Sequence, residues 1–384
     1  MCGSADLEVI ARQSFEALAG SLIDGYDIAC CRMCGFGYAS DLPTQAEFDR
    51  YYAGMSRYED GVASYSTSPE DQARCRSIVD MVQSAGLDKG SAVLDVGCAT
   101  GSLLAVFKDR GFRDVEGLDP SPTCAAIALQ EHEIRVLTGS ASDVPDLSKR
   151  YGLVTLSEVL EHLLDPIQVL RDIRQVLEST GLIMVEVPDV EGFSSCAKAP
   201  FQEFSMEHVN FFSSASIASA MARAGFERVA AERLRIPWQS GGTAAILRVI
   251  YRPAATTTST DPDVATREAL LDYVSTCEAI EASVRARILT LADRGGPVIV
   301  WGVGTHTRHL LKSGAFDPLM IAAWVDSDPK YQGTEMRGAP VLAPSQVAAR
   351  NEPILISSGT VHHEIARQLR HDLGLRNEVV FLYE

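Results

Sequence analysis

A short apolar segment that runs straight into a glycine-containing turn constrains this chain more than any other feature. Residues 93–96 suit a parallel strand buried on both faces. Gly97 and Gly101 let the backbone turn sharply and approach a ligand, and the helix expected after them offers free backbone N–H groups at its start. Asp119 closes the next apolar segment, 115–118, at the distance of the acid that binds a ribose in nucleotide-binding folds. This spacing predicts a nucleoside site.

The turn does not carry the dinucleotide fingerprint G-x-G-x-x-G, so no pyrophosphate contact is expected there. It reads D-x-G-C-x-T-G from Asp95 to Gly101, and G-L-D follows at 117–119. This pattern resembles the S-adenosylmethionine (SAM) loop of class I methyltransferases. The resemblance implies SAM as the cofactor, bound by Asp95, Gly97, Cys98, Ala99, Gly101, Asp119, Pro120, Ala141, Ser157 and Glu158.

Strand-like and helix-like segments alternate on both sides of the loop. Helices are expected over 69–86 and 124–131, and strands over 115–118, 135–138, 153–156 and 182–187. Such alternation predicts a parallel sheet with helices on both faces, which binds ligands at the carboxyl ends of its strands. We therefore expect an α/β protein built on a class I methyltransferase (Rossmann-like) sheet.

The 384 residues are too many for one ordinary domain. We expect a zinc-binding knuckle and tyrosine-rich lid over 1–68 and a SAM-binding methyltransferase domain over 69–252. A second Rossmann-like α/β domain is expected over 253–384, and its first part, 253–263, reads as a linker rich in proline and threonine.

Charge narrows the set of partners. The formal net charge is −17, which disfavours sequence-independent binding to nucleic acid and to anionic membrane surfaces, because both depend on clustered lysine and arginine. The first residues carry acids where a signal peptide needs basic and apolar ones, and no run of about 18 apolar residues follows. We expect a cytoplasmic protein that is a monomer or a dimer.

Four of the nine cysteines crowd into the first 34 residues. Cys31 and Cys34 form a C-x-x-C-G knuckle, in which a tight turn lets two thiolates reach one zinc ion, and Cys2-Gly-Ser looks like the second half of another knuckle. The first half of that knuckle could lie upstream of Met1, Cys30 or another group could complete the site, or the turn could hold no metal. The preferred prediction is a structural zinc bound at least by Cys2, Cys31 and Cys34.

Two further segments carry candidate catalytic groups. Residues 45–68 are rich in tyrosine, which fits helix packing or a lid over a ligand, and Tyr65 is the expected ligand contact. Glu207 and His208 stand side by side among aromatic residues, where a carboxylate could orient a histidine as a general base. The alternative is a satisfied histidine at a helix start. For His162, in E-x-L-E-H-L-x-D-P, a packed or capping role is the preferred interpretation.

Several strings occur in an order that makes a more specific resemblance. They are E-V-P-D at 186–189, E-H-x-x-x-F-S at 207–213, A-G-F at 224–226 and G-G-T…L-R-V at 241–249. With the cysteine knuckle they resemble the three-domain, zinc-containing sugar C-methyltransferases that make branched-chain deoxysugars. This chain has Ser205 where that family usually has tyrosine, and three residues, 244–246, precede its Leu-Arg pair. These departures leave the reaction class in place and put the particular sugar in doubt.

The C-terminal part reads as a long helix, 264–294, followed by a second α/β unit. Its first turn has only two of the three fingerprint glycines, so a dinucleotide site is not expected. The resemblance implies that this unit helps to bind a nucleotide-sugar, and a purely structural or dimerising role is the alternative. The expected substrate-binding residues are Gly302, Gly304, His306 and Asp326.

The methylation of a sugar carbon, which the resemblance implies, assigns a role to each candidate catalytic residue. SAM is an electrophile, so methylating carbon requires an enolate, and a 4-keto sugar has an acidic proton on the adjacent carbon. We expect His208 to remove the C3 proton, Glu207 to orient it, and Tyr65 or Asn210 to stabilise the enolate. One rival is an O- or N-methyltransferase acting on a sugar or natural product, and another is a non-catalytic SAM-binding scaffold.

Overall fold

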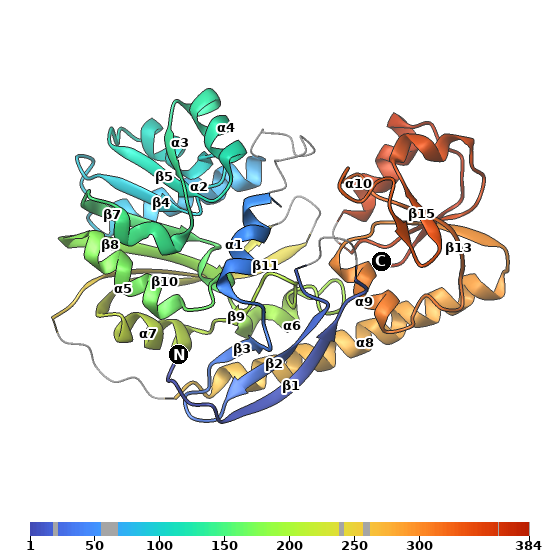
Figure 1. The fold of residues 1–384 in the computed structure, drawn as a ribbon, viewed down its shortest axis with the longest axis horizontal. Coiled ribbons are helices and arrows are strands. Elements are labelled where there is room, and N and C mark those ends of the chain that lie inside the picture. The colour runs from blue at the N-terminus through green and yellow to red at the C-terminus, as the bar shows by residue number, and fades with distance from the viewer. Residues whose placement is uncertain (18–21, 55–67, 238–241, 256–261, 360, 384) are drawn as a thin grey trace.

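The computed structural model describes the chain except for residues 18–21, 55–67, 238–241, 256–261, 360 and 384. The described residues form three β-sheets, and one long helix runs from the first sheet to the third (Figure 1). The first sheet is antiparallel and has the order β1-β2-β3-β9. Its strands are β1 (Leu7–Ser14), β2 (Gly25–Cys31), β3 (Gly37–Ser40) and β9 (Asn210–Phe211).

The second sheet confirms the predicted parallel arrangement and is larger than predicted. Its order is β10-β11-β8-β7-β4-β5-β6, and the strands from β4 to β8 pair in parallel. At one edge β11 pairs antiparallel with β8, and β10 pairs antiparallel with β11; the alternation pattern does not predict these two. The strands are β4 (Val93–Val96), β5 (Val115–Asp119), β6 (Arg135–Thr138), β7 (Tyr151–Ser157), β8 (Leu177–Pro188), β10 (Phe226–Pro237) and β11 (Thr243–Pro253).

Helices pack on both faces of this sheet because successive strand residues point to opposite sides. Val93 belongs to a core with α2 and α3, whereas its neighbour Leu94 belongs to a core with α5 and α7 (Figure 1). Caps set two of the helix starts: Ser68 accepts from the N–H of Asp71, and Asp165 from that of Gln168. The helices are α2 (Pro69–Ser84), α3 (Ser102–Asp109), α4 (Pro122–His132), α5 (Pro166–Val176) and α7 (Ser214–Arg223).

The C-terminal unit has a third sheet with the order β14-β15-β13-β12-β16-β17. Its central strands are parallel, as predicted for a second α/β unit. Its strands are β12 (Pro297–Trp301), β13 (Met320–Val325), β14 (Glu335–Met336), β15 (Ala339–Leu342), β16 (Ile354–Ile356) and β17 (Val379–Phe381), with helices α9 (Thr305–Lys312) and α10 (His362–Arg367).

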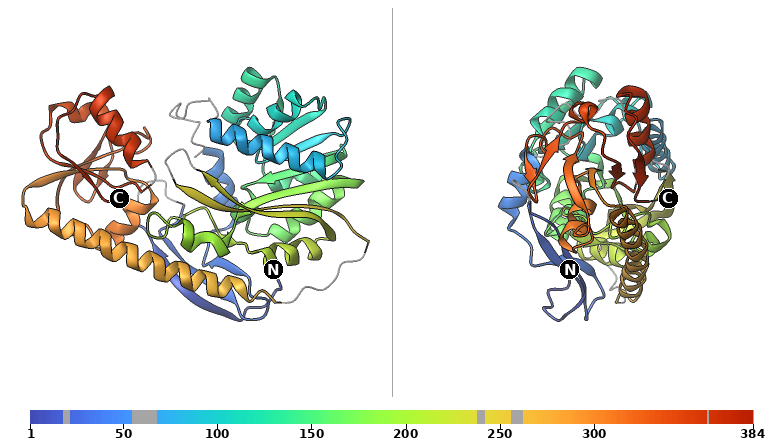
Figure 2. Two further views of the ribbon diagram at one scale, coloured as in Figure 1. Left: turned by 180° about the vertical axis from the view of Figure 1, so that it is seen from behind. Right: turned by 90° about the vertical axis from the view of Figure 1, so that its right-hand side faces the viewer.

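The long helix α8 (Ala265–Asp293) confirms the predicted helix over 264–294. Its first half packs in the core of the first sheet through residues such as Leu270 and Tyr273, and its second half packs on the third sheet through residues such as Ile288 (Figures 1 and 2). No helix among the described residues is both long and apolar enough to cross a membrane. The described residues also include the helices α1 (Gln45–Gly54) and α6 (Phe193–Cys196).

A buried charge network joins the second sheet to α2. Glu186 on β8 is fully buried and accepts hydrogen bonds from Arg74 of α2 and Arg248 of β11, each at 2.5 Å. Arg248 also donates to Ser77 of α2 and to Glu232 of β10. One carboxylate therefore holds together a helix and the antiparallel edge of the sheet.

Replacing Glu186 with glutamine should lower the free energy of unfolding by about 3–5 kcal/mol, because Arg74 and Arg248 lose the fully buried carboxylate that they share and each keeps only a more exposed one, Glu158 or Glu232. Urea denaturation measures the loss. The control is Glu227→Gln, since Glu227 pairs with Arg252 on the exposed surface and such pairs contribute little. Equal losses for the two variants would contradict a structural role for Glu186.

Candidate active site

The glycine turn after β4 has the shape of a ligand cradle. Gly97 has φ +74°, and a Cβ atom placed on it would lie 2.4 Å from Cγ2 of Val159. Gly101 has φ +80° and precedes the first turn of α3, where backbone N–H groups have no intrahelical partner. A side chain at position 97 would collide with Val159, so glycine keeps this turn tight. The free N–H groups at the start of α3 fit the binding of a SAM molecule beside the turn.

Asp119 fastens this loop to the next strand. Its Oδ2 accepts a hydrogen bond from the N–H of Ala99 at 2.8 Å, and its Oδ1 accepts one from the N–H of Ser121 at 2.9 Å. Burial raises the pKa of the carboxyl despite these two bonds. Carboxylate oxygens have further lone pairs, so a ribose contact remains the prediction for Asp119. Pro120 follows it directly, and Ala141 is buried where β6 leads into the next turn.

The side chains of Asp95 and Cys98 are both buried. Asp95 is buried on β4 and accepts from Oγ1 of Thr155 at 2.6 Å, and burial raises its pKa to about 7. Cys98 is buried against Gly117, where a Cβ atom would lie 2.3 Å from its Sγ. The two side chains therefore make contacts within the protein, and SAM binding by these two residues stays a prediction.

Ser157 and Glu158, which are expected to bind SAM, both accept hydrogen bonds from Arg74 of α2. Arg74 donates from Nη2 to Oγ of Ser157 and from Nη1 to Oε2 of Glu158, each at 2.9 Å. Glu158 itself has φ +57°, an uncommon value for a residue with a side chain. Arg74 sits in an ordinary amphipathic helix pattern, so no local signal marks it.

The segment that carries Glu207 and His208 brings two histidines together. The rings of His162 and His208 are edge to face with centroids 4.9 Å apart, and Nδ1 of His162 is 3.0 Å from the backbone oxygen of Glu207. Burial, together with His162, lowers the pKa of His208 to about 3, and burial also lowers the pKa of His162. His208 is therefore neutral at physiological pH and has a lone pair that can accept a proton.

The carboxylate of Glu207 does not point at His208. Its Oε1 accepts a hydrogen bond from the hydroxyl of Tyr51 on α1 at 2.8 Å. The carboxylate that faces the two rings belongs to Glu161, whose Oε1 is 3.9 Å from Nε2 of His162. This corrects the expectation that Glu207 orients the histidine. The sequence string E-H at 161–162 was the available signal for Glu161.

Asn210 has a structural role in this region. Its side-chain amide donates to the backbone oxygens of Leu163 at 2.6 Å and Leu160 at 3.2 Å, which fixes the turn that carries Glu161 and His162. The expectation that Asn210 stabilises an enolate is therefore wrong for this arrangement, since its donor group is already used. Tyr65, the other expected donor, lies outside the described residues.

The C-terminal unit repeats the loop arrangement of the second sheet. Asp326 after β13 accepts from the N–H of Val303 at 2.8 Å, as Asp119 does from Ala99. Gly302 has φ +105°, and Gly304 is exposed before α9 with open space around it. The ring nitrogens of His306, by contrast, are buried without a hydrogen-bond partner, and the ring packs on Tyr383. His306 is therefore not presented to a substrate as expected.

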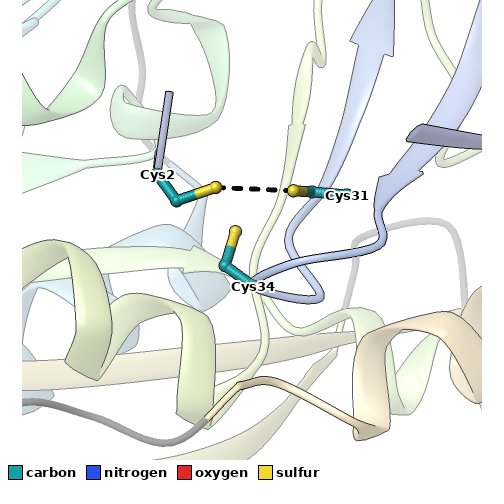
Figure 3. A group of neighbouring side chains, drawn as sticks. All are labelled: Cys2, Cys31 and Cys34. Atoms are coloured by element: carbon teal, nitrogen blue, oxygen red, sulfur yellow. Dashed lines mark hydrogen bonds between the residues drawn. The ribbon is translucent and has the colours of Figure 1, made fainter. Parts of the chain in front are cut away.

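Three of the N-terminal cysteines converge. The Sγ atoms of Cys2, Cys31 and Cys34 lie within 4.8 Å of one another and point to a common centre (Figure 3). The sulfurs of Cys2 and Cys31 are 3.5 Å apart, close to the roughly 3.8 Å edge of a tetrahedron with Zn–S bonds of about 2.3 Å. Cys30, considered as a fourth ligand, instead points its thiol at the backbone oxygen of Gly35.

The loop, the acid after β5 and the sheet order define a class I SAM methyltransferase fold. Residues 70–231 match a family model described as a methyltransferase domain. The chain is a SAM-dependent methyltransferase.

One relative matches along most of the chain. C-methyltransferase NovU of Streptomyces niveus is 26% identical over 379 residues, which cover 91% of this chain and 86% of that protein. A tRNA U34 carboxymethyltransferase of Pseudoalteromonas translucida is 30% identical over 149 residues, or 37% of this chain and 46% of that protein. Among solved structures, the 1,6-didemethyltoxoflavin-N1-methyltransferase of Burkholderia thailandensis aligns with a TM-score of 0.43 and 18% identity over 57% of this chain and 96% of that chain.

Gly97→Ala should weaken SAM binding at least about tenfold, because the methyl group collides with Val159 and the left-handed backbone is strained. Isothermal titration calorimetry with SAM measures the change. Gly86→Ala is the matched control, since Gly86 also has a positive φ, +95°, but open space around it and a place after α2. Similar SAM affinities for the two variants would rule out a cradle at Gly97.

Asp95 should make folding stability depend on pH. Its pKa is raised to about 7 from an ordinary 3.8, so the folded state holds this proton more tightly than the unfolded state. The resulting stabilisation is complete below pH 3.8 and is lost as the pH rises through about 7. Unfolding measured at about pH 5 and pH 8 should show a smaller loss of stability for Asp95→Asn than for the wild type. Equal losses would contradict a buried, protonated Asp95.

Proposed function

We propose that this protein is a SAM-dependent C-methyltransferase that acts on a nucleotide-linked 4-keto deoxysugar. The likeness to C-methyltransferase NovU carries the proposal, because it extends over 91% of the chain and so includes the first sheet and the C-terminal unit as well as the methyltransferase domain. The nucleotide-sugar is proposed as the methyl acceptor because the sequence strings between residues 186 and 249 resemble those of sugar C-methyltransferases. The paired histidines beside the loop after β7 support it, since a carbon acid needs a base.

His208 is the proposed base. It is neutral at physiological pH and lies on the insertion between β8 and β9, next to the carboxyl ends of the parallel strands. His208 takes the proton from C3 of the sugar, and the electron pair of that C–H bond becomes the enolate. SAM, when bound, supplies the electrophilic methyl group. Tyr51 and Glu207 form a hydrogen-bonded pair at the same segment and are placed to bind sugar hydroxyls.

The C-terminal unit is proposed to bind the nucleotide part of the substrate. Gly302, Gly304 and Asp326 form a turn of the kind seen at the SAM loop, and the exposed Gly304 leaves room for a ligand at the start of α9. His306 is not included, because its ring nitrogens are buried and its ring packs on Tyr383.

We also propose a structural zinc bound by Cys2, Cys31 and Cys34. Thiolates are preferred zinc ligands, and the three sulfurs already lie close to tetrahedral spacing. The metal would fix the turn between β2 and β3, and β3 pairs with β9, which begins two residues after His208. The zinc is not required for methyl transfer itself.

His208→Ala should abolish turnover and leave SAM affinity nearly unchanged, because the side chain is proposed to act only on the acceptor. Methyl transfer from labelled SAM to a panel of 4-keto nucleotide-sugars, read by mass, measures this. The control is His132→Ala at the end of α4, far from the paired rings along the chain. Wild-type turnover by His208→Ala would refute the assignment.

Exchange at carbon separates this function from its rivals. With the 4-keto sugar in D₂O, the enzyme should place deuterium at C3, because proton removal precedes methyl transfer. An O- or N-methyltransferase has no reason to exchange that proton, and a scaffold would transfer no methyl group at all. Methyl transfer without exchange at C3 would therefore favour the O- or N-methylating rival.

The purified protein should contain about one zinc per chain, and Cys34→Ser should lose this zinc. The control is Cys75→Ser, which changes a cysteine outside the cluster and should keep the zinc. Elemental analysis measures the metal. Loss of zinc should lower the unfolding temperature before it lowers the rate of the chemical step. A zinc-free wild type that is as stable as the purified protein would contradict the proposal.

A further inference from the structure

Glu161 has a buried carboxylate for which the proposed reaction has no use. The residue is 1% exposed, and neither of its carboxylate oxygens has a hydrogen-bond partner. Asn210 and the N–H of Val209 hold the backbone of this turn in place, so the side chain is not free to swing out with a loop. Such unsatisfied groups in a folded protein are uncommon and mark a missing ligand or proton.

The groups around this carboxylate are metal ligands by type. One ligand atom each from Glu161, His162 and His208 lies within 4.8 Å of the other two. The distance from Oε1 of Glu161 to Nε2 of His162 is 3.9 Å, and two ligands of one metal with bonds of about 2.1 Å lie about 3.4 Å apart in a tetrahedral site. A contraction of about half an ångström would bring the two atoms onto a single ion.

The surroundings of His162 also match those of a metal ligand. Its Nδ1 is 3.0 Å from the backbone oxygen of Glu207, which can only accept, so Nδ1 carries the proton and Nε2 carries the lone pair. Metal-binding histidines usually donate their second ring nitrogen to a carbonyl or carboxylate in this way. The carbonyl therefore sets the tautomer that presents Nε2 toward Glu161.

We propose that Glu161, His162 and His208 form a second metal site, which binds a divalent transition metal such as Zn²⁺ or Co²⁺. Two imidazoles and one carboxylate suit these ions and leave positions open for water or a substrate oxygen. The site differs from the cysteine site in having no sulfur ligand. Its consequence rests on the proposed function: a metal ion that takes the lone pair of His208 blocks proton removal, so excess metal inhibits methyl transfer.

Cobalt titration tests the binding. Co²⁺ is added to the full-length chain with zinc already bound at the cysteine site, so that the thiolates of Cys2, Cys31 and Cys34 are occupied. We expect weak visible bands of an oxygen–nitrogen site and no intense sulfur-to-cobalt band. Glu161→Gln in the same background should weaken cobalt binding at least about tenfold. Glu203→Gln is the matched control, since Glu203 is another glutamate of this region and its carboxylate accepts from Gln202.

The outcomes are separable. Equal cobalt affinity for Glu161→Gln and Glu203→Gln, or a spectrum with sulfur bands alone, would overturn the metal site. Zn²⁺ added to wild-type enzyme should reduce methyl transfer, and less so after the keto-sugar is bound; unchanged turnover with cobalt bound would overturn the inhibition. If no keto-sugar is methylated at all, the proposed function fails, and the cobalt spectra still decide the metal site.

Discussion

The pairing of β3 with β9 is the constraint on which the arrangement of this enzyme depends. β9 begins two residues after His208, yet it completes the first sheet, in which Gly37 pairs with Phe211 and Tyr38 pairs with Asn210. Asn210 then fixes the turn of Glu161 and His162 through its side chain. The position of the proposed base is thus set from two sides, by the cysteine-bearing sheet and by the end of β7.

Much of the fold was predictable because it depends on local patterns. The apolar runs at 93–96 and 115–118 and the glycine turn between them predict a parallel sheet, and the long helix α8 follows from a continuous helical pattern. The strands β10 and β11 were not predicted, since β10 alternates between exposed and half-buried residues and begins directly after a helix. The pairing of β9 has no local signal, because only two residues form the strand.

The sequence predicts which types of residue lie in the candidate site, but it predicts fewer of the contacts between their side chains. The glycine turn and Asp119 lie together as expected, and Glu207 and His208 occur next to each other in the chain. The side chain of Glu207 nevertheless turns to Tyr51, more than a hundred residues earlier, while Glu161 faces the histidines. Adjacency in sequence does not fix where neighbouring side chains point. Arg74 contacts Glu158 and Glu186 from α2, and the apolar pattern of that helix predicts only which of its residues are buried.

The distance along the chain between the two halves of the first sheet has a consequence for how the protein is made. Tyr26 donates to the backbone oxygen of Ser205, a contact between residues 179 positions apart. During synthesis, β1, β2 and β3 leave the ribosome long before their fourth strand exists, with an unpaired edge at β3. The zinc proposed for the cysteine turn would hold this early sheet in shape until β9 is synthesised. In that case zinc supply would limit the yield of folded enzyme, although the metal takes no part in methyl transfer.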